Sequence, residues 1–364
     1  MDENKLTGIA SLFMTSGRPC SARRLGNGLI NDTFIIACQP GGHSYVLQRI
    51  NTDIFRDPDT LQDNMLAISA HLRKCLIEEG IADADRRALE CVLTHDSKSY
   101  VISDGECWRM TRFIEGSVSI AGMSEKMARN VGLAFGKFHC TLARPDAPEL
   151  GETIPDFHNM PLRLSQLEEA MKADRVGRLA DVREMADELL ARTTEMMLAE
   201  NMHSDGRLPK RIIHCDTKAD NILFDENGEI LCVIDLDTTM PGFVMDDFGD
   251  FLRTAGNTAA EDEPDTSKIR FDMDVFRPFA RGYVESASFL TPEEKMTLVH
   301  GALRMTYMQA IRFFADYLNG DTYYKTAYTD HNLVRTRNQM TLLSSIDSHM
   351  EEMKAFIDTL YRLK

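Results

Sequence analysis

The sequence lacks any apolar run of the ~18 residues that a membrane-spanning helix requires. Its first residues, Met1 to Lys5, are polar and show no secretory-signal pattern. The chain is also poor in basic residues, because 41 Lys and Arg stand against 57 Asp and Glu, a formal net charge of −16. Nucleic acids and anionic lipid surfaces both attract basic proteins, so we expect neither nucleic acid nor membrane as a partner.

Paired cysteine motifs are absent as well. The eight cysteines are scattered without a C-x-x-C pair, and most of them lie in apolar or helical surroundings. A zinc site or a disulfide framework needs cysteines that are clustered or regularly spaced. We therefore expect buried, reduced thiols and a cytoplasmic protein.

The chain does have enough length for two cores, since 364 residues exceed what one simple core accommodates. Residues 1–115 combine strand-like runs, which include two hairpins, with one segment of helical spacing over 60–79. Residues 116–364 are mainly helical in pattern. The sequence thus predicts an α+β fold, with a small strand-rich N-terminal lobe at 1–115 that contains one main helix. A larger, mainly helical C-terminal lobe is expected at 116–364.

Several patterns in residues 116–364 predict helices. Apolar residues recur at helical spacing over 127–142 and over 162–198. The stretch Thr291-Pro292-Glu293-Glu294 has Thr as N-cap, Pro at N1 and Glu at N3, which predicts a helix start. We expect this helix to run to Leu318 and a final helix to fill most of 332–363.

Polar residues gather in one loop between apolar runs. The strand-like runs 212–213 and 222–224 bracket a loop that contains Asp216 and Asn221. A hairpin turn then leads to a third apolar run, which ends at Asp235. Strands hold such a loop in a fixed position. We therefore expect the three side chains to meet around one divalent ion at the mouth of a cleft between the lobes.

These residue types suit phosphoryl transfer from a magnesium nucleotide. A carboxylate, here Asp216, can accept the proton of the attacking hydroxyl. The amide oxygen of Asn221 and the carboxylate of Asp235 are hard oxygen ligands of the kind that Mg²⁺ prefers. The alternative interpretation is that Asp216 and Asn221 only form turns and that Asp235 caps a helix. His214 is expected to support the loop.

Further stretches extend the pattern over nearly the whole chain: LINDTF at 29–34, VLQRIN at 46–51, WR at 108–109, FGKFH at 135–139, IPDFH at 154–158, IDLDT at 234–238, MPG at 240–242, DFGD at 247–250 and DYLNGD at 316–321. In these stretches and in the loop above, the chain resembles the aminoglycoside phosphotransferase and choline kinase group. These small-molecule kinases share the protein-kinase-like fold. Within the group, the chain is most similar to N-acetylhexosamine 1-kinases.

The resemblance implies a two-lobed protein-kinase-like fold, in which the lobe at 1–115 binds the nucleotide and the lobe at 116–364 carries catalysis and acceptor binding. It also implies a reaction between ATP, held with Mg²⁺, and a small-molecule acceptor. The favoured acceptor is the anomeric hydroxyl of N-acetylglucosamine or N-acetylgalactosamine. Asp216 becomes the catalytic base, and Asn221 and Asp235 become metal ligands. Asp237 is a third metal candidate, and it is equally well a solvated acid at a strand end. The DFGD stretch at 247–250 lies too far after Asp216 to bind the metal, so we interpret its acids as structural.

The nucleotide contacts expected from the resemblance lie in the N-terminal lobe. Gly28, Asn31 and Asp32 belong to a glycine-containing loop that is expected to cover the phosphates, although G-x-G alone is equally typical of a turn. The strand at 46–49 has no lysine where protein kinases carry one. Arg49 or Gln48 is therefore expected to reach the phosphates.

For the acceptor, the resemblance points to Phe157, His158 and Arg312. Their side chains suit a sugar, which needs several hydrogen-bonding groups and one apolar wall. Phe157 can alternatively belong to the core, and Arg312 can alternatively pair with Asp316 one helical turn later.

Other functions remain open at this level. The same chemistry can act on choline, homoserine or an aminoglycoside. A non-catalytic pseudokinase that serves as a binding module is disfavoured, because Asp216, Asn221 and Asp235 are all present.

Overall fold

The structure is a computed structural model, and it describes residues 2–26, 30–39, 41–118 and 122–362. The chain forms two compact units that are interleaved along the sequence. The first unit comprises Met1–Ile120, Thr141–Pro155 and Asp220–Met240, and the second comprises Ala121–Cys140, Asp156–Ala219 and Pro241–Lys364. The division into lobes at residue 115 stays a prediction. The predicted α+β class is confirmed by a strand-rich first unit and a mainly helical second unit.

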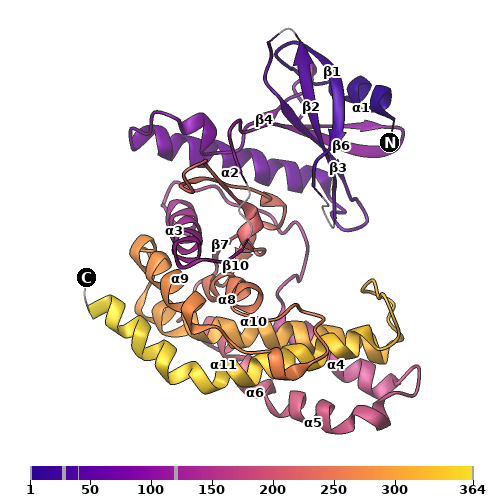
Figure 1. Cartoon of the computed structure of the whole chain (residues 1–364), viewed down its shortest axis with the longest axis vertical. Coiled ribbons are helices and arrows are strands. Elements are labelled where there is room, and N and C mark those ends of the chain that lie inside the picture. The colour runs from indigo at the N-terminus through magenta and orange to yellow at the C-terminus, as the bar shows by residue number, and fades with distance from the viewer. Residues whose placement is uncertain (1, 27–29, 40, 119–121, 363–364) are drawn as a thin grey trace. The chain divides into compact units, whose positions relative to one another are not determined.

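The first unit contains an antiparallel sheet, and Figure 1 labels most of its strands. Its strands are β1 (Arg18–Arg24), β2 (Asp32–Gln39), β3 (Tyr45–Ile50), β4 (Cys91–Val92), β5 (Tyr100–Ser103) and β6 (Glu106–Arg112). The order is β1-β2-β3-β6-β4, with β5 paired to β6. Both predicted hairpins, β2–β3 and β5–β6, are confirmed. The helices are α1 (Glu3–Ala10), α2 (Pro58–Glu78) and the short 3₁₀ helix η1 (Ala84–Arg86).

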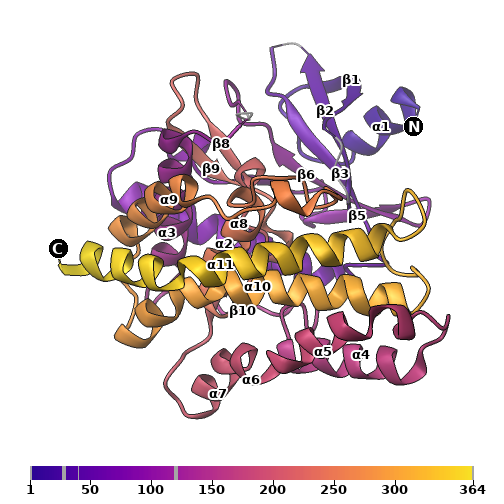
Figure 2. The same cartoon turned by 60° about the horizontal axis from the view of Figure 1, so that its bottom comes forward.

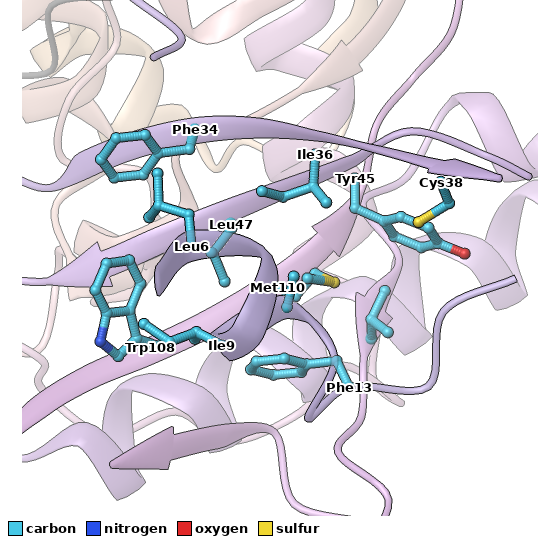
Figure 3. Packing of buried hydrophobic residues seen from close by; sticks show 12 residues of the cluster. Leu6, Ile9, Phe13, Phe34, Ile36, Cys38, Tyr45, Leu47, Trp108 and Met110 are labelled. Atoms are coloured by element: carbon cyan, nitrogen blue, oxygen red, sulfur yellow. The ribbon is translucent and has the colours of Figure 1, made fainter. Parts of the chain in front are cut away.

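One face of this sheet packs on the N-terminal helix. Alternate residues of β2, β3 and β6 are buried there, which is the pattern that the pleat imposes. Figure 3 shows the cluster: Phe34, Ile36, Leu47, Trp108 and Met110 from the sheet lie against Leu6, Ile9 and Phe13. The sequence pattern did not predict α1 or β1, and the helix is needed because an uncovered apolar sheet face is unstable in water.

The last part of the first unit is the predicted hairpin β8 (Ile222–Phe224) and β9 (Ile230–Val233), followed by the 3₁₀ helix η4 (Leu236–Thr238). β8 and β9 pair antiparallel. A further 3₁₀ turn, η3 (Ala219–Asn221), leads into β8. The two short strands β7 (Arg211–Ile213) and β10 (Met240–Gly242) pair with each other.

The second unit is mainly helical, and Figure 2 shows α10 and α11 side by side. Its elements are α3 (Glu125–Leu142), α4 (Met160–Ala173), η2 (Leu179–Val182), α5 (Arg183–Ala191), α6 (Thr193–Met196), α7 (Leu198–Ser204), α8 (Val244–Ala255), η5 (Thr266–Lys268), α9 (Met273–Ser286), α10 (Pro292–Leu318) and α11 (His331–Arg362). The Thr291–Glu294 capping box is confirmed. The segment 162–198 is divided into several helices, because Asp174 adopts a left-handed conformation that ends α4.

Two glycines bring α8 and α10 into close contact. A Cβ at Gly249 would lie 2.1 Å from the backbone of Gly301, and a Cβ at Gly301 would lie 1.8 Å from the carbonyl oxygen of Met245. Only residues without a side chain permit this approach. The close contact fixes α8, which carries Asp246, Asp247 and Asp250. Within the described ranges, no helix is both long enough and apolar enough to cross a bilayer.

Candidate active site

The β8–β9 hairpin brings two of the predicted metal ligands to the same end. Asn221 directly precedes β8, and Asp235 follows β9 by two residues. Ile222 lies opposite Val233, and the backbone nitrogen of Ile234 donates to the carbonyl oxygen of Asn221 over 2.9 Å. Asp235 has φ of 60°, a left-handed conformation that is uncommon for a residue with a side chain. Such strain is typical of functional turns, where the surrounding structure holds it.

Asp237 is held by protein groups from the sheet. Its side chain is almost fully buried, and its two oxygens accept hydrogen bonds of 2.5 Å and 2.9 Å from Arg109 and one of 2.7 Å from Asn31. Thr153 donates to the carbonyl oxygen of Asp237 over 2.6 Å. A bidentate arginine–carboxylate pair is strong and directional. These contacts favour a role in fixing the loop that carries Asp235, while a metal contact by Asp237 stays a prediction.

The register of the sheet separates the two candidate phosphate contacts. Thr33, Gln48 and Arg109 lie opposite one another on neighbouring strands, so they share a face. The side-chain oxygen of Gln48 accepts from Arg109 over 2.9 Å, which links Gln48 to Asp237. Arg49 belongs to the other face, which also carries Trp108.

Arg49, Asp32 and Glu106 form an ion-pair cluster on that other face. Arg49 is paired with both carboxylates. The hydrogen bond from Arg49 outweighs partial burial and lowers the pKa of Asp32. The side chains of Arg49 and Asp32 are thus both bound to other groups of the protein. Gly28 lies outside the described residues. Asn31 is buried, and its side-chain oxygen accepts from the backbone nitrogen of Asn51 over 2.9 Å.

The loop that carries Asp216 is anchored to α8 within the second unit. Asp247 accepts from the backbone nitrogens of His214 and Cys215, over 2.5 Å and 2.8 Å. Asp250 accepts from the backbone nitrogen of Thr217 over 3.1 Å. These bonds confirm the structural interpretation of the DFGD stretch. Cys215 has φ of 64°, so the backbone turns sharply just before Asp216.

A buried histidine completes the support of this loop. His139 of α3 contacts Asp247 over 2.8 Å through Nε2 and the Tyr283 hydroxyl over 2.7 Å through Nδ1. Burial alone would raise the pKa of Asp247, but the hydrogen bond and charge of His139 outweigh it, so that pKa is lowered. Asp247 therefore stays ionised and keeps accepting from the loop. The Asp216 carboxylate lies 2.7 Å from the ammonium group of Lys218.

Asp216 belongs to the second unit, whereas Asn221 and Asp235 belong to the first. Only four residues of chain lie between Asp216 and Asn221. Their meeting around one ion stays a prediction. The donor set fits Mg²⁺ in its chemistry, because an amide oxygen and carboxylates are the hard ligands that this ion prefers.

Two of the predicted acceptor residues, Phe157 and His158, stack on each other with ring centroids 4.7 Å apart. The side chain of His158 is 11% exposed, and its Nδ1 lies 4.0 Å from a carboxylate oxygen of Asp246. Burial lowers the pKa of His158 to about 3, and burial raises the pKa of Asp246 to about 6. His158 is therefore neutral near pH 7. Since Asp246 adjoins Asp247 on α8, these rings lie near the anchor of the Asp216 loop.

The third acceptor candidate, Arg312 on α10, lines a cavity of about 370 Å³ in the second unit. Arg163 of α4 lines the same cavity and donates to the carbonyl oxygen of Phe157 over 3.1 Å. The structure thus connects Phe157 to the cavity of Arg312 through Arg163. The alternative partner of Arg312 is engaged elsewhere, because both oxygens of Asp316 accept from backbone nitrogens of 322–324.

Sequence reasoning gave no role to two arginines. Arg109 is a single charged residue between the buried Trp108 and Met110, which was a usable signal, since a buried charge needs a partner. Arg163 lies on a helix with other charged residues, and nothing in its spacing distinguishes it.

Comparison with known proteins shows which family and which solved structures the chain resembles. The model described as "Phosphotransferase enzyme family" matches residues 21–279, which is more than half of the chain. An aminoglycoside phosphotransferase from Alicyclobacillus acidocaldarius has a similar structure, with a TM-score of 0.57, 15% sequence identity, and coverage of 94% of this chain and 92% of that one. A spectinomycin phosphotransferase, in complex with ADP and spectinomycin, gives a TM-score of 0.52 at 14% identity and covers 99% of both chains.

An ethanolamine kinase from Plasmodium vivax is also similar, with a TM-score of 0.51, 14% identity, and coverage of 88% of this chain and 82% of that one. At these identities the likeness establishes the fold. The predicted protein-kinase-like fold of this group is confirmed.

Proposed function

The chain belongs to the phosphotransferase enzyme family and is a small-molecule kinase, and we propose that it transfers the γ-phosphoryl group of ATP to a sugar hydroxyl. The proposed acceptor is the anomeric hydroxyl of N-acetylglucosamine or N-acetylgalactosamine, and the product is the sugar 1-phosphate. The observation that carries the chemistry is the end of the β8–β9 hairpin, where Asn221 and Asp235 lie together.

Asp216 is the proposed catalytic base. It would accept the proton of the acceptor hydroxyl as the oxygen–phosphorus bond forms and the bond to the ADP oxygen breaks. The anchoring of its loop by Asp247 supports this role, because a base must be held within hydrogen-bond reach of the proton it removes.

Asn221 and Asp235 would hold Mg²⁺, which supplies charge neutralisation at the phosphates when bound. Asp237 would keep the Asp235 turn in place through Arg109. For contact with the nucleotide phosphates, Gln48 is favoured over Arg49. Gln48 shares the sheet face of Arg109, and through Arg109 it is linked to the loop that carries the proposed metal ligand Asp235. Gly28, Asn31 and Asp32 stay proposed phosphate-loop contacts.

Support for the sugar acceptor comes from the surroundings of Phe157 and His158. An apolar ring next to a neutral histidine and an arginine-lined cavity offers the apolar wall and the hydrogen-bonding groups that a sugar needs. We also propose a cytoplasmic location, which fits the eight free thiols.

The proposal is tested by ATP consumption across N-acetylhexosamines, hexoses, choline, homoserine and an aminoglycoside, with magnesium omitted as a control. We expect an N-acetylhexosamine to give the highest kcat/KM. Asp216→Asn should lower kcat by about 10²–10⁴-fold, because the base is lost, while ATP binding measured by calorimetry persists. Asp220→Asn is the matched control, because Asp220 is an exposed carboxylate in the same loop.

Three results would contradict the proposal. A best acceptor other than a sugar would exclude the assigned substrate. Full turnover in Asp216→Asn would remove Asp216 from its role. Binding of ATP without phosphorylation of any acceptor would favour the pseudokinase alternative.

A further inference from the structure

The cavity beside α4 and α10 is positively charged in a strongly acidic protein. Three arginines line it: Arg163 on α4, Arg175 just after α4, and Arg312 on α10. Within the described parts of the chain, none of the three forms an ion pair with a carboxylate. Arg175 is exposed, but Arg163 and Arg312 are half-buried, and most other half-buried arginines do form such pairs. Positive charge without a protein counter-ion favours an external anion.

The hydrogen bonds of Arg163 show how its charge is left uncompensated. Its terminal nitrogens donate to neutral acceptors, namely the side-chain oxygen of Gln166 at 3.0 Å and the carbonyl oxygens of Asp156 and Phe157 at 3.0 Å and 3.1 Å. Its buried Nε has no acceptor within the described residues. Burial, and then the nearby charge of Arg312, lower the pKa of Arg163, so the two cations destabilise each other in the absence of an anion.

Arg312 is half-buried, and its contacts with the protein are weak. It donates to Gln309 over a long 3.4 Å, and its guanidinium lies 5.7 Å from the ring centroid of Tyr324. The planar fork of a guanidinium is suited to bidentate binding of a carboxylate or a phosphate. The described structure thus gives Arg312 only these two contacts, both long and both with neutral groups, and its fork remains available to a ligand.

The acidic residues of the lining do not neutralise these arginines. Asp316 is buried, and its oxygens accept from three backbone nitrogens and from the side chain of Asn332 over 2.8 Å. This carboxylate therefore shapes the loop that carries Tyr323 and Tyr324. Glu169 is exposed on α4, where solvent screens its charge.

The size and walls of the cavity suit a sugar derivative. Its volume of about 370 Å³ falls within the range of small-molecule sites, roughly 300–1,000 Å³. Tyr323, which is 73% exposed, lies edge-to-face against Tyr324 with ring centroids 4.8 Å apart. Tyr323 therefore offers an exposed stacking surface next to Tyr324, the ring that lies 5.7 Å from the Arg312 guanidinium.

The position of the cavity connects it to the loop of the proposed base. Asp247 anchors that loop, and its neighbour Asp246 faces His158. His158 stacks on Phe157, whose carbonyl oxygen accepts from Arg163 at the cavity wall. All of these residues belong to the second unit, so the connection is continuous within one compact body.

We propose that this cavity binds an anionic substituent, a carboxylate or a phosphate, of the acceptor sugar, with Arg312 as the main contact and Arg163 as a supporting charge. The inference rests on the proposed function and narrows its substrate class to sugars, N-acetylhexosamines included, that carry an acidic substituent. The acceptor then places its reacting hydroxyl toward Asp216 and its anionic substituent in the cavity.

Matched acceptor pairs test this inference. The pairs are glucose with glucuronic acid, which adds a carboxylate, and N-acetylglucosamine with N-acetylglucosamine 6-phosphate, which adds a phosphate. We expect the acidic member of at least one pair to have a KM roughly 10–100-fold lower than its neutral partner, as a charge-assisted contact provides. The pair that responds identifies the anion. Calorimetric titration of the same compounds without ATP measures binding separately from turnover.

Three variants distinguish a specific contact from a general charge effect. Arg312→Gln should remove the preference for the acid, and Arg312→Lys should retain part of it, because the charge stays and the fork is lost. Arg337→Gln is the matched control, since Arg337 is exposed on α11 and contributes no side chain to the cavity. It should keep the full preference.

The outcomes separate the inference from the proposed function. Equal or better use of the neutral sugars would overturn the inference and leave the kinase assignment intact. A preference for the acid that persists in Arg312→Gln would also overturn it. Tight, Arg312-dependent binding of the acids without phosphorylation would support the anion site and contradict the proposed reaction.

Discussion

The buried ion pair between Arg109 and Asp237 leads to a sharp prediction about stability. The side chains are 2% and 3% exposed, and two hydrogen bonds join them. Asp237→Asn keeps the shape of the side chain but leaves a buried guanidinium without its counter-charge. Removing one partner of a buried pair typically destabilises a protein by about 3–5 kcal/mol. The hydrogen bond that Asn31 donates to Asp237 also loses its charged acceptor, which adds to this destabilisation.

Urea unfolding followed by tryptophan fluorescence is the suitable assay. Trp108 is the only tryptophan, and it lies fully buried next to Arg109 in β6, so its emission reports the first unit. With a denaturant slope of about 2 kcal/mol per molar urea, the midpoint should fall by about 1.5–2.5 M. The matched control is Glu351→Gln, which removes an exposed pair with Lys354 and should change stability by less than about 1 kcal/mol.

A double variant refines the test. Arg109→Met with Asp237→Leu replaces both charges by apolar groups, which often recovers or exceeds the original stability. We therefore expect the double variant to unfold near the wild-type midpoint, and to lose activity because the Asp235 turn loses its anchor. A midpoint for Asp237→Asn within about 0.3 M of wild type, at about 2 kcal/mol per molar urea, would refute the reasoning, since it would mean that the pair contributes no more than a surface ion pair.

Two further predictions concern the second unit. Gly249→Ala should destabilise the protein by about 1–3 kcal/mol or more, because its Cβ would meet the Gly301 backbone. The control Gly8→Ala, where the added Cβ would enter open space on α1, should be neutral or stabilising. Equal thermal midpoints for the two variants would contradict the close α8–α10 contact. His158 has a folded pKa of about 3 against about 6.5 when unfolded, so the unfolded chain binds the extra proton and stability falls as pH drops from 6.5 toward 3. His158→Phe should reduce the slope of unfolding free energy against pH by up to about 1.4 kcal/mol per pH unit. Urea unfolding at several pH values, followed by circular dichroism, measures this slope. An unchanged slope would show that His158 is not buried in its neutral form.

The sequence anticipated elements whose signals are local. The β2–β3 hairpin, the helix α2 and the capping box of α10 each depend on periodicity or capping within one segment, and each is confirmed. The DFGD stretch was also interpreted correctly as structural. The helix α1 escaped notice because it is short, and the break after Ala173 escaped notice because a single aspartate in a left-handed conformation ends the helix.

The sequence by itself determined which residue types are available for chemistry, since an Asp, an Asn and a further Asp at strand ends are visible in one dimension. Only the tertiary structure decided what those groups touch. Pairing register placed Gln48 with Arg109 and turned Arg49 to the other face, because neighbouring residues of a strand point in opposite directions. Long-range packing likewise gave Asp237 its arginine and brought Arg163 and Arg312 to one cavity, contacts between residues more than a hundred positions apart that no local pattern encodes.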